Sequence, residues 1–156
     1  MEIRFAVEDD YMHVEKISAQ GQHYHVNLRP DIYKDATDQC PALSKEGFIE
    51  IVHNETMIVC VDEGRILAYM MFEEKIVTSP LKIKQKILYI DNLAVDDDYK
   101  QRGISKMLMA WIKRYASKNQ YDKIELQVCD KNHIAKQLYN SEGFTNKSIN
   151  MEYFLE

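Results

Sequence analysis

The sequence has few of the residues that mark secreted or membrane-bound proteins. It contains only three cysteines, Cys40, Cys60 and Cys129, an odd number at widely separated positions. This excludes a disulfide scaffold, and we expect free thiols in a reducing, cytoplasmic compartment. No apolar run is long enough to span a bilayer, so we expect no membrane partner. The N-terminus, Met1-Glu2-Ile3-Arg4, does not have the pattern of a signal peptide.

Positive charge is not in excess either. Twenty Lys and Arg residues stand against 25 Asp and Glu residues, which gives a net charge of −5. We therefore expect no nucleic-acid partner, and the charge favours a cationic substrate. A hydrophobic content of 46% and a charged content of 29% are typical of a folded globule. No repeat, low-complexity segment or linker divides the chain, so residues 1–156 are expected to form a single domain.

The order of expected elements indicates an α/β fold with a mixed sheet. Hydrophobic periodicity and turn residues predict strands over residues 3–7, 56–61, 66–74, 87–95 and 124–129, and a last strand or strand pair over 144–154. Helices are expected from residue 9 or 10 to about 19, from Ser44, over 103–119 and over 133–141. Residues 20–39 are the least regular part. We therefore predict a mostly antiparallel meander followed by a βαβαβ unit, with helices on both faces of the sheet.

The segment around Gly103 carries the clearest chemical signal. An apolar strand ends at Val95, a polar loop follows, and Ile104 begins a helix with apolar residues at helical spacing. The first amides of a helix have no intrahelical acceptor, and the helix dipole adds positive potential there. Lys100 and Arg102 contribute formal charge. The loop is therefore expected to bind a phosphate or pyrophosphate.

Two glycine-based nucleotide motifs are missing from this loop. No Walker lysine–serine pair follows it, and no dinucleotide glycine triplet is present. A nucleotide-binding α/β protein with either of these motifs is therefore the least favoured of the alternatives.

Two segments together resemble the GNAT superfamily of N-acyltransferases. The phosphate loop of that family carries Arg or Gln, two variable residues, Gly, one variable residue, and Gly or Ala. Residues 100–105 stand in this register, with Gly103 matched strictly; Lys100 replaces Arg or Gln, and Ser105 replaces Gly or Ala. Gln101 stands where many relatives have a further glycine. The second segment, residues 132–144, is similar to the family's signature for the helix beside the cofactor thiol, with the skeleton Asn132, Ala135, Tyr139, Gly143 and Phe144.

The resemblance covers nearly the whole chain and implies a function. A member of this family transfers an acetyl group from acetyl-CoA, without a metal, to a primary amine of a small molecule or peptide. Transfer is direct and takes place in a ternary complex. Because many members of the family are homodimers, the resemblance also suggests a homodimer. The residues implied in cofactor binding are Leu93, Ala94, Val95, Lys100, Gln101, Arg102, Gly103, Ile104, Ser105 and Asn132. The alternative is a CoA-binding sensor or partner-binding module without turnover, for which the departures in the loop leave room.

Tyr139 is the candidate acid for the departing thiolate. A phenol has a pKa of about 10, so its hydroxyl can donate a hydrogen bond or a proton to sulfur as charge builds there. Packing on the inner face of the helix is the alternative role. Cys129 is not expected to form an acyl intermediate, because transfer in the family is direct.

Asp91 is one candidate base for deprotonating the amine. It lies in an otherwise apolar strand, and we expect it on the same pleat face as Leu93 and Val95, with Tyr89 positioned to share a water molecule. A hydrogen-bonding carboxylate at the strand end, or a chain of water molecules in place of a single base, is the alternative.

The segment between the first two helices lines the acceptor site in the resembling family. His23, His25 and Arg29, with Asp31, are therefore candidate substrate contacts, although ordinary loop structure is the alternative for each. Two histidines two residues apart can clamp a metal, but no third ligand stands at suitable spacing, so no metal is expected.

Overall fold

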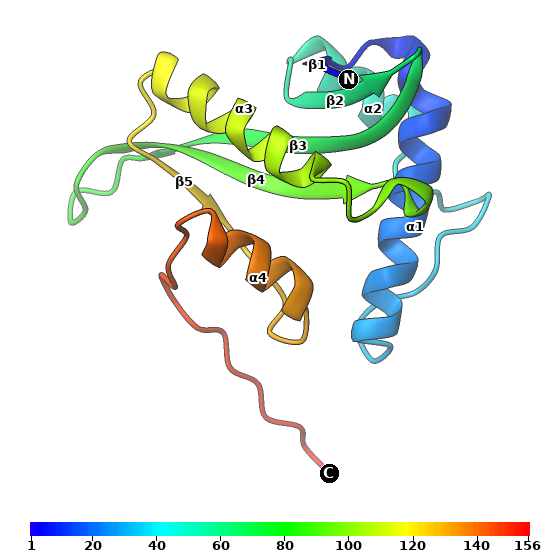
Figure 1. Cartoon of the computed structure of the whole chain (residues 1–156). Coiled ribbons are helices and arrows are strands. Elements are labelled where there is room, and N and C mark those ends of the chain that lie inside the picture. Colours follow the sequence, from blue (N-terminus) through cyan, green and yellow to red (C-terminus); the bar gives the residue numbers. More distant parts are fainter.

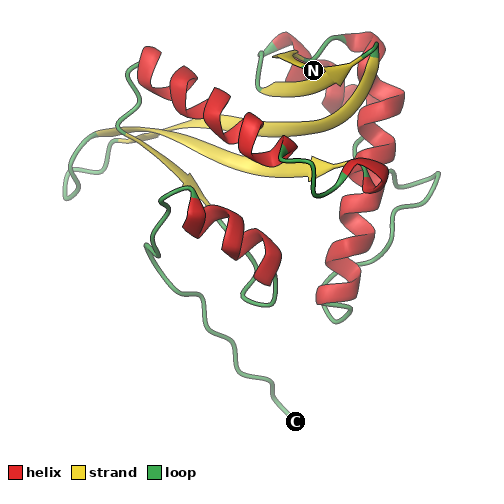
Figure 2. Ribbon diagram, in the orientation of Figure 1, coloured by secondary structure: helices red, strands yellow, loops and turns green.

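The computed structural model describes all residues from 1 to 156 as one mixed sheet covered by helices (Figures 1 and 2). The strands are β1 (Glu2–Phe5), β2 (Met57–Asp62), β3 (Arg65–Val77), β4 (Gln85–Val95) and β5 (Lys123–Leu126). The helices are α1 (Tyr11–Leu28), α2 (Lys45–His53), α3 (Ile104–Lys118) and α4 (His133–Ser141), with short 3-10 turns η1 (Glu8–Asp10) and η2 (Asp97–Tyr99). None of the helices combines the length and the apolar character that crossing a membrane requires.

The strands lie in the sheet in chain order, from β1 to β5. Neighbours from β1 to β4 are antiparallel, whereas β5 runs parallel to β4. A two-residue turn joins β2 to β3, and both of its residues have positive φ: 47° at Glu63 and 76° at Gly64. That geometry matches the right-handed twist of a hairpin, which is why the predicted turn forms at this position.

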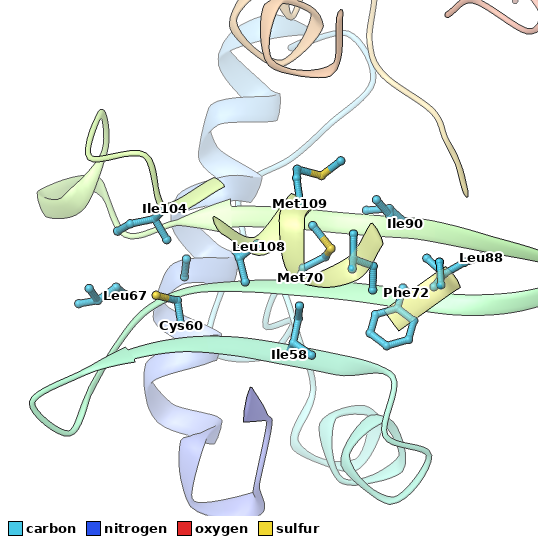
Figure 3. Close-up of a cluster of buried hydrophobic side chains, with 13 residues drawn as sticks. Ile58, Cys60, Leu67, Met70, Phe72, Leu88, Ile90, Ile104, Leu108 and Met109 are labelled. Atoms are coloured by element: carbon cyan, nitrogen blue, oxygen red, sulfur yellow. The ribbon is translucent and has the colours of Figure 1, made fainter. Parts of the chain in front are cut away.

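Each face of the sheet has its own apolar cluster. On one face, Phe48 of α2 and Val14 and Ile17 of α1 pack with side chains of β2 and β3. On the other face, Ile104, Leu108, Met109, Ile112 and Ala116 of α3 pack with alternate residues of β2, β3 and β4 (Figure 3). Tyr139 and Phe144, at the end that includes α4, pack against this second cluster. The predicted α/β fold with a mixed sheet and helices on both faces is confirmed.

The prediction that residues 20–39 are irregular is wrong for the first part of this range. Helix α1 continues to Leu28 and stops before Pro30, where the proline ring disfavours a helical conformation of the preceding residue. Gly21 lies inside this helix, and a Cβ added there would lie 3.7 Å from the Cβ of Ala94 in β4. Packing against the sheet therefore stabilises a helix whose local sequence is polar and aromatic.

The last predicted strand is also absent. Residues 145–156 have no regular secondary structure, and their N–H and C=O groups make no hydrogen bond within the chain. The βαβαβ unit therefore lacks its final strand. In Figure 1 this C-terminal segment leads away from the sheet below α4.

Candidate functional site

The loop before α3 presents a row of free backbone N–H groups. No N–H group of residues 101–106 donates to any backbone or side-chain acceptor, and the first amide of α3 that does is that of Met107, which donates to the Gly103 carbonyl at 3.2 Å. Helix geometry explains the last three of these groups, because the first turn has no acceptor before it. An anion at this helix start would be stabilised by the amides and by the helix dipole.

Two left-handed residues shape this loop. Gly103 caps α3 with a φ of 75°, and Gln101 has a φ of 62°. Glycine adopts this conformation readily, whereas glutamine does so at a cost. Gln101 stands where many relatives have a glycine, and it keeps the left-handed backbone conformation in spite of its side chain.

The two cations of the loop differ in their surroundings. The ammonium group of Lys100 lies 2.5 Å from a carboxylate oxygen of Asp97 and 5.5 Å from the ring centroid of Tyr24 in α1. The guanidinium of Arg102 lies 5.0 Å from the ring centroid of Tyr99 and donates only a long bond of 3.4 Å to the Asp98 carbonyl. Arg102 is therefore the freer of the two to bind an anion.

Strands β4 and β5 separate beside this loop. Their pairing runs from Ile87 opposite Lys123 to Ile90 opposite Leu126, whereas β4 continues to Val95 with only β3 beside it (Figure 1). Beyond Ile90, the groups of β4 that point away from β3 have no strand beside them. Leu93, Ala94 and Val95 lie in this separated part, where backbone donors and acceptors can meet an extended, peptide-like ligand arm.

A β-bulge at Asp91 changes the predicted pleat. Asn92 lies opposite Met71, but Ile90 lies opposite Phe72, so Asp91 is the extra residue of β4. The expectation that Asp91 shares a face with Leu93 and Val95 is therefore wrong. Leu93 and Val95 pack against the cluster that contains Leu88 and Ile90, since the alternation slips by one residue at the bulge.

A pocket of about 110 Å³ lies where the two strands separate. It brings together several predicted site residues from distant parts of the chain. Its lining consists of His25, Ile90, Asp91, Asn92, Leu93, Leu126, Gln127, Val128, Cys129, Asn132, Ala135 and Tyr139. The sequence did not single out Asn92, Gln127 or Val128, because a separation of strands leaves no local signal in the residues that line it.

Tyr139 faces this pocket from α4. Its ring centroid lies 5.7 Å from that of Phe144, and its hydroxyl makes no hydrogen bond within the protein. Burial raises the pKa of Tyr139, which keeps its hydroxyl protonated at neutral pH. The side chain therefore combines the predicted packing role with a hydroxyl that is available as a donor.

The carboxyl of Asp91 is accessible to solvent, and the surrounding protein removes part of its hydration. Burial raises the pKa of its carboxyl, the negative charge of Glu73 adds to the rise, and Lys75 opposes it. Tyr89 is not among the residues that line the pocket, and its ring lies under the ammonium group of Lys75 at 3.5 Å. The structure therefore brings Asp91, but not Tyr89, to the pocket.

The two histidines of α1 point in different directions. Residues two apart on a helix are separated by about 200° around its axis, so they cannot act as a pair. His23 Nδ1 lies 2.8 Å from the exposed carboxylate of Asp35, whereas His25 lines the pocket, with its ring centroid 5.4 Å from that of Tyr33. Burial lowers the pKa of His25, which favours its neutral form.

Arg29 is occupied by carboxylates of its own chain. It donates to Asp31 at 2.8 and 2.7 Å and lies 2.8 Å from Glu152 of the C-terminal segment. These hydrogen bonds lower the pKa of Asp31 to about 2. The predicted substrate contacts at positions 29 and 31 therefore form an internal ion pair, and neither residue lines the pocket.

Asn132 was named as a cofactor-binding residue, and the structure also gives it a structural role that the sequence analysis did not predict. Its side-chain oxygen accepts from the Ala135 amide at 3.1 Å and so caps α4. The hydroxyl of Tyr24 donates to the same oxygen at 3.4 Å. Asn132 thus connects α1 to the start of the helix that carries Tyr139, at the edge of the pocket.

A larger hollow of about 230 Å³ has none of the predicted site residues in its lining. It is lined by His13, Lys16, Arg65, Ile66, Asp96, Asp98 and Tyr99. Three of its charged groups are already engaged, because Lys16 lies 3.3 Å from Asp96 and Arg65 donates to the Tyr99 hydroxyl at 2.6 Å. No group of three or more His, Cys, Asp or Glu side chains is arranged to hold a metal ion. The smaller pocket, which brings the predicted site residues together, is therefore the better candidate for the functional site.

Comparisons with known proteins agree with this geometry. Residues 22–144 match the model of the acetyltransferase (GNAT) family. A structure of a single-residue mutant of the BH1408 protein from Bacillus halodurans is 32% identical, with a TM-score of 0.92 and 100% of both chains covered. No curated protein is detectably similar in sequence.

Two more distant structures share the fold. The aminoglycoside N-acetyltransferase AAC(6')-Iy, solved in complex with CoA, has a TM-score of 0.69 at 13% identity, with 99% of this chain and 93% of that chain covered. An aminoglycoside acetyltransferase from an uncultured soil metagenomic sample, solved with sisomicin, has a TM-score of 0.66 at 15% identity, with 99% and 96% covered. The chain belongs to the acetyltransferase (GNAT) family, and acetyl transfer is the general activity that this membership supports.

Proposed function

We propose that this protein transfers an acetyl group from acetyl-CoA to a primary amine of a small molecule or peptide, directly and in a ternary complex. The row of free N–H groups over residues 101–106 is the observation that carries the proposal. It lies next to the separated end of β4, so one ligand with a diphosphate and a peptide-like arm can use both. Acetyl-CoA is such a ligand, and it supplies the acetyl group and the leaving thiolate.

The residues around the pocket have different roles in the transfer. The amides of residues 101–105, with Arg102, bind the diphosphate, and the backbone of Leu93 to Val95 orients the arm. Tyr139 holds a proton on its hydroxyl at the pocket wall and donates it toward the departing sulfur. Asp91, which also lines the pocket, accepts a proton from the amine directly or through water.

The charge of the protein and of its pocket supports a cationic amine as the acceptor. Asp91 is the only carboxylic acid in the pocket lining, and the chain has a net charge of −5. A cationic amine is favoured by both, because it approaches a negative protein and meets a carboxylate at the site. Two of the more distant structures are those of aminoglycoside acetyltransferases, which act on substrates of this charge class.

Calorimetry and an amine panel test the proposal in two steps. We expect heat of binding when CoA or acetyl-CoA is titrated into the protein, and no binding at millimolar ligand would end the proposal. We then expect CoA release from acetyl-CoA to rise with at least one amine of a panel of polyamines, aminoglycosides and peptide N-termini. Binding without any amine-dependent release is the result that would support a CoA-binding sensor instead.

A further inference from the structure

Helix α4, which carries Tyr139, has little apolar surface in the core. None of its nine residues is buried, and a helix of this length is marginal in water without tertiary support. Tyr139 and, just after the helix, Phe144 pack against the cluster that α3 forms with the sheet. Polar contacts at the two ends of α4 therefore contribute to its position.

The C-terminal end of α4 is closed by a left-handed glycine. Gly143 has a φ of 90°, and its amide donates to the Asn140 carbonyl at 3.1 Å. The Phe144 amide donates to the Tyr139 carbonyl at 3.0 Å. These two bonds form a Schellman motif, which satisfies two of the last carbonyls of the helix. The carbonyl of Glu142, the capping residue, accepts no backbone amide and is left for a partner outside the helix.

Lys113 of α3 binds this end of α4 twice. Its ammonium group donates to the Glu142 carbonyl at 2.8 Å and to a carboxylate oxygen of the same residue at 2.7 Å. The side chain of Glu142 is only 18% exposed, so water competes with this ion pair less than with a pair on the open surface. A positive charge at the C-terminus of a helix also interacts favourably with the helix dipole.

Helix α3 also carries the amides that are expected to bind phosphate. Its buried face packs on the sheet and fixes its position (Figure 3). Lys113 lies about 15 Å along this helix from Gly103, at 1.5 Å per residue. The contact between Lys113 and the end of α4 therefore sets the position of Tyr139 relative to the loop of residues 101–105.

We propose that Lys113 is a positioning residue for acetyl transfer, which holds the end of α4 against α3 so that the Tyr139 hydroxyl faces the CoA sulfur. Lys113 does not line the pocket, so it acts through the position of Tyr139. The role of Tyr139 rests on the proposed function, whereas the contact between the two helices does not. Because a small displacement of a reacting group can cost about 100-fold in rate, loss of this contact is expected to lower kcat.

Amide hydrogen exchange tests the contact without any substrate. Lys113→Met keeps most of the side-chain length but removes the charge and the donors. We expect the amides of residues 138–144 to exchange about tenfold faster in this variant, since a hydrogen bond to a charged group is lost. The matched control Lys118→Met changes an exposed lysine near the end of the same helix and should exchange as the wild type does. Equal exchange at residues 138–144 in both variants overturns the proposal.

Steady-state kinetics test the positioning of Tyr139. We expect Lys113→Met to lower kcat about tenfold or more and to leave KM for acetyl-CoA nearly unchanged, because the misplaced hydroxyl acts only in the transition state. Lys113→Arg, which keeps the charge and the donors, should recover most of this loss. In a Tyr139→Phe background, Lys113→Met should lower kcat little further, since the group that it positions is gone.

Two kinetic results overturn the proposal. One is a wild-type kcat in Lys113→Met. The other is a full additional loss in the Tyr139→Phe background, which would mean that Lys113 acts without Tyr139. If the wild type releases CoA with no amine of the panel, the proposed function fails instead, and the exchange measurement alone decides whether Lys113 holds α4.

Discussion

The side-chain amide of Asn92 donates a hydrogen bond of 3.0 Å to the hydroxyl of Tyr69. This bond connects the residue next to the β-bulge to a buried tyrosine of β3, which also accepts from Ser18 of α1 at 2.9 Å. Asn92 lines the pocket, whereas Tyr69 lies in the cluster on the α1 side of the sheet. A network on one face of the sheet therefore holds the position of the bulge, and with it Asp91.

Removal of the Tyr69 hydroxyl should destabilise the protein. Tyr69→Phe leaves the hydroxyl of Ser18 and the amide of Asn92 without their partner, which costs about 1–3 kcal/mol. Tyr115→Phe is the matched control, because the Tyr115 hydroxyl makes no hydrogen bond within the chain, and it should change the free energy of unfolding by much less. Urea denaturation measures both, and equal losses would contradict a structural role for the network.

Gly103→Ala should weaken CoA binding and lower stability together. Alanine at a φ of 75° carries a strain of roughly 1–2 kcal/mol, although an added Cβ meets no atom within 4 Å. Relief of this strain turns the neighbouring N–H groups away from the ligand. We expect Kd for CoA to rise about tenfold, or about 1.4 kcal/mol, as measured by calorimetry.

Gly64→Ala is the matched control for this variant. Gly64 has a φ of 76° in the β2–β3 turn, and an added Cβ is equally free of contacts. Its stability loss should resemble that of Gly103→Ala, whereas its affinity for CoA should equal that of the wild type. The same rise in Kd for both variants would attribute the effect to general destabilisation.

Tyr139→Phe should slow the chemical step and leave binding nearly intact. The phenyl ring keeps the packing against Phe144, but the proton donor is lost, and general acids contribute about 100-fold or more to kcat. Steady-state kinetics with the best amine of the panel separate kcat from KM for acetyl-CoA. Tyr121→Phe, which removes a hydroxyl that donates to Glu74 outside the pocket lining, should turn over at the wild-type rate. A kcat for Tyr139→Phe equal to that of the wild type would remove this residue from its role.

The pKa of Asp91 predicts the pH dependence of both activity and stability. Because burial and Glu73 raise its pKa in the folded state, the folded chain binds more protons than the unfolded chain between the two pKa values. Stability from this group therefore falls as pH rises through that window, and Asp91→Asn should abolish this fall. The base form appears above the raised pKa, so kcat/KM should increase with pH there.

Glu73→Gln provides the control for this assignment. Removal of the neighbouring negative charge should lower the pKa of Asp91 and shift the rise of kcat/KM to lower pH. A profile that stays unchanged in both Glu73→Gln and Asp91→Asn would show that another group, or water alone, accepts the proton.

The phosphate loop and α3 could be predicted because their signals are local. Ile104, Leu108 and Ile112 recur at helical spacing and are buried, and Gly103 stands at the helix start in the left-handed conformation. Tyr139, His25 and Asp91 were named as site residues, and one pocket brings them together, while their roles stay predictions. The resemblance to a known family, rather than periodicity, supplied that connection.

The errors arose where tertiary contacts decide the structure. Helix α1 continues past Gly21 because this glycine packs against Ala94, which no local pattern reveals. The bulge at Asp91 cannot be seen from an apolar strand, because it depends on the register with Met71 and Phe72 of β3. The last strand was predicted from local sequence, but residues 145–156 pair with no strand of the chain.

A crystal structure of the protein with CoA tests the central claim most directly. We predict diphosphate oxygens within hydrogen-bonding distance of the N–H groups of residues 101–105, and the CoA sulfur in the pocket facing the Tyr139 hydroxyl. A diphosphate bound elsewhere on the protein, or a sulfur that lies away from Tyr139, would contradict the account.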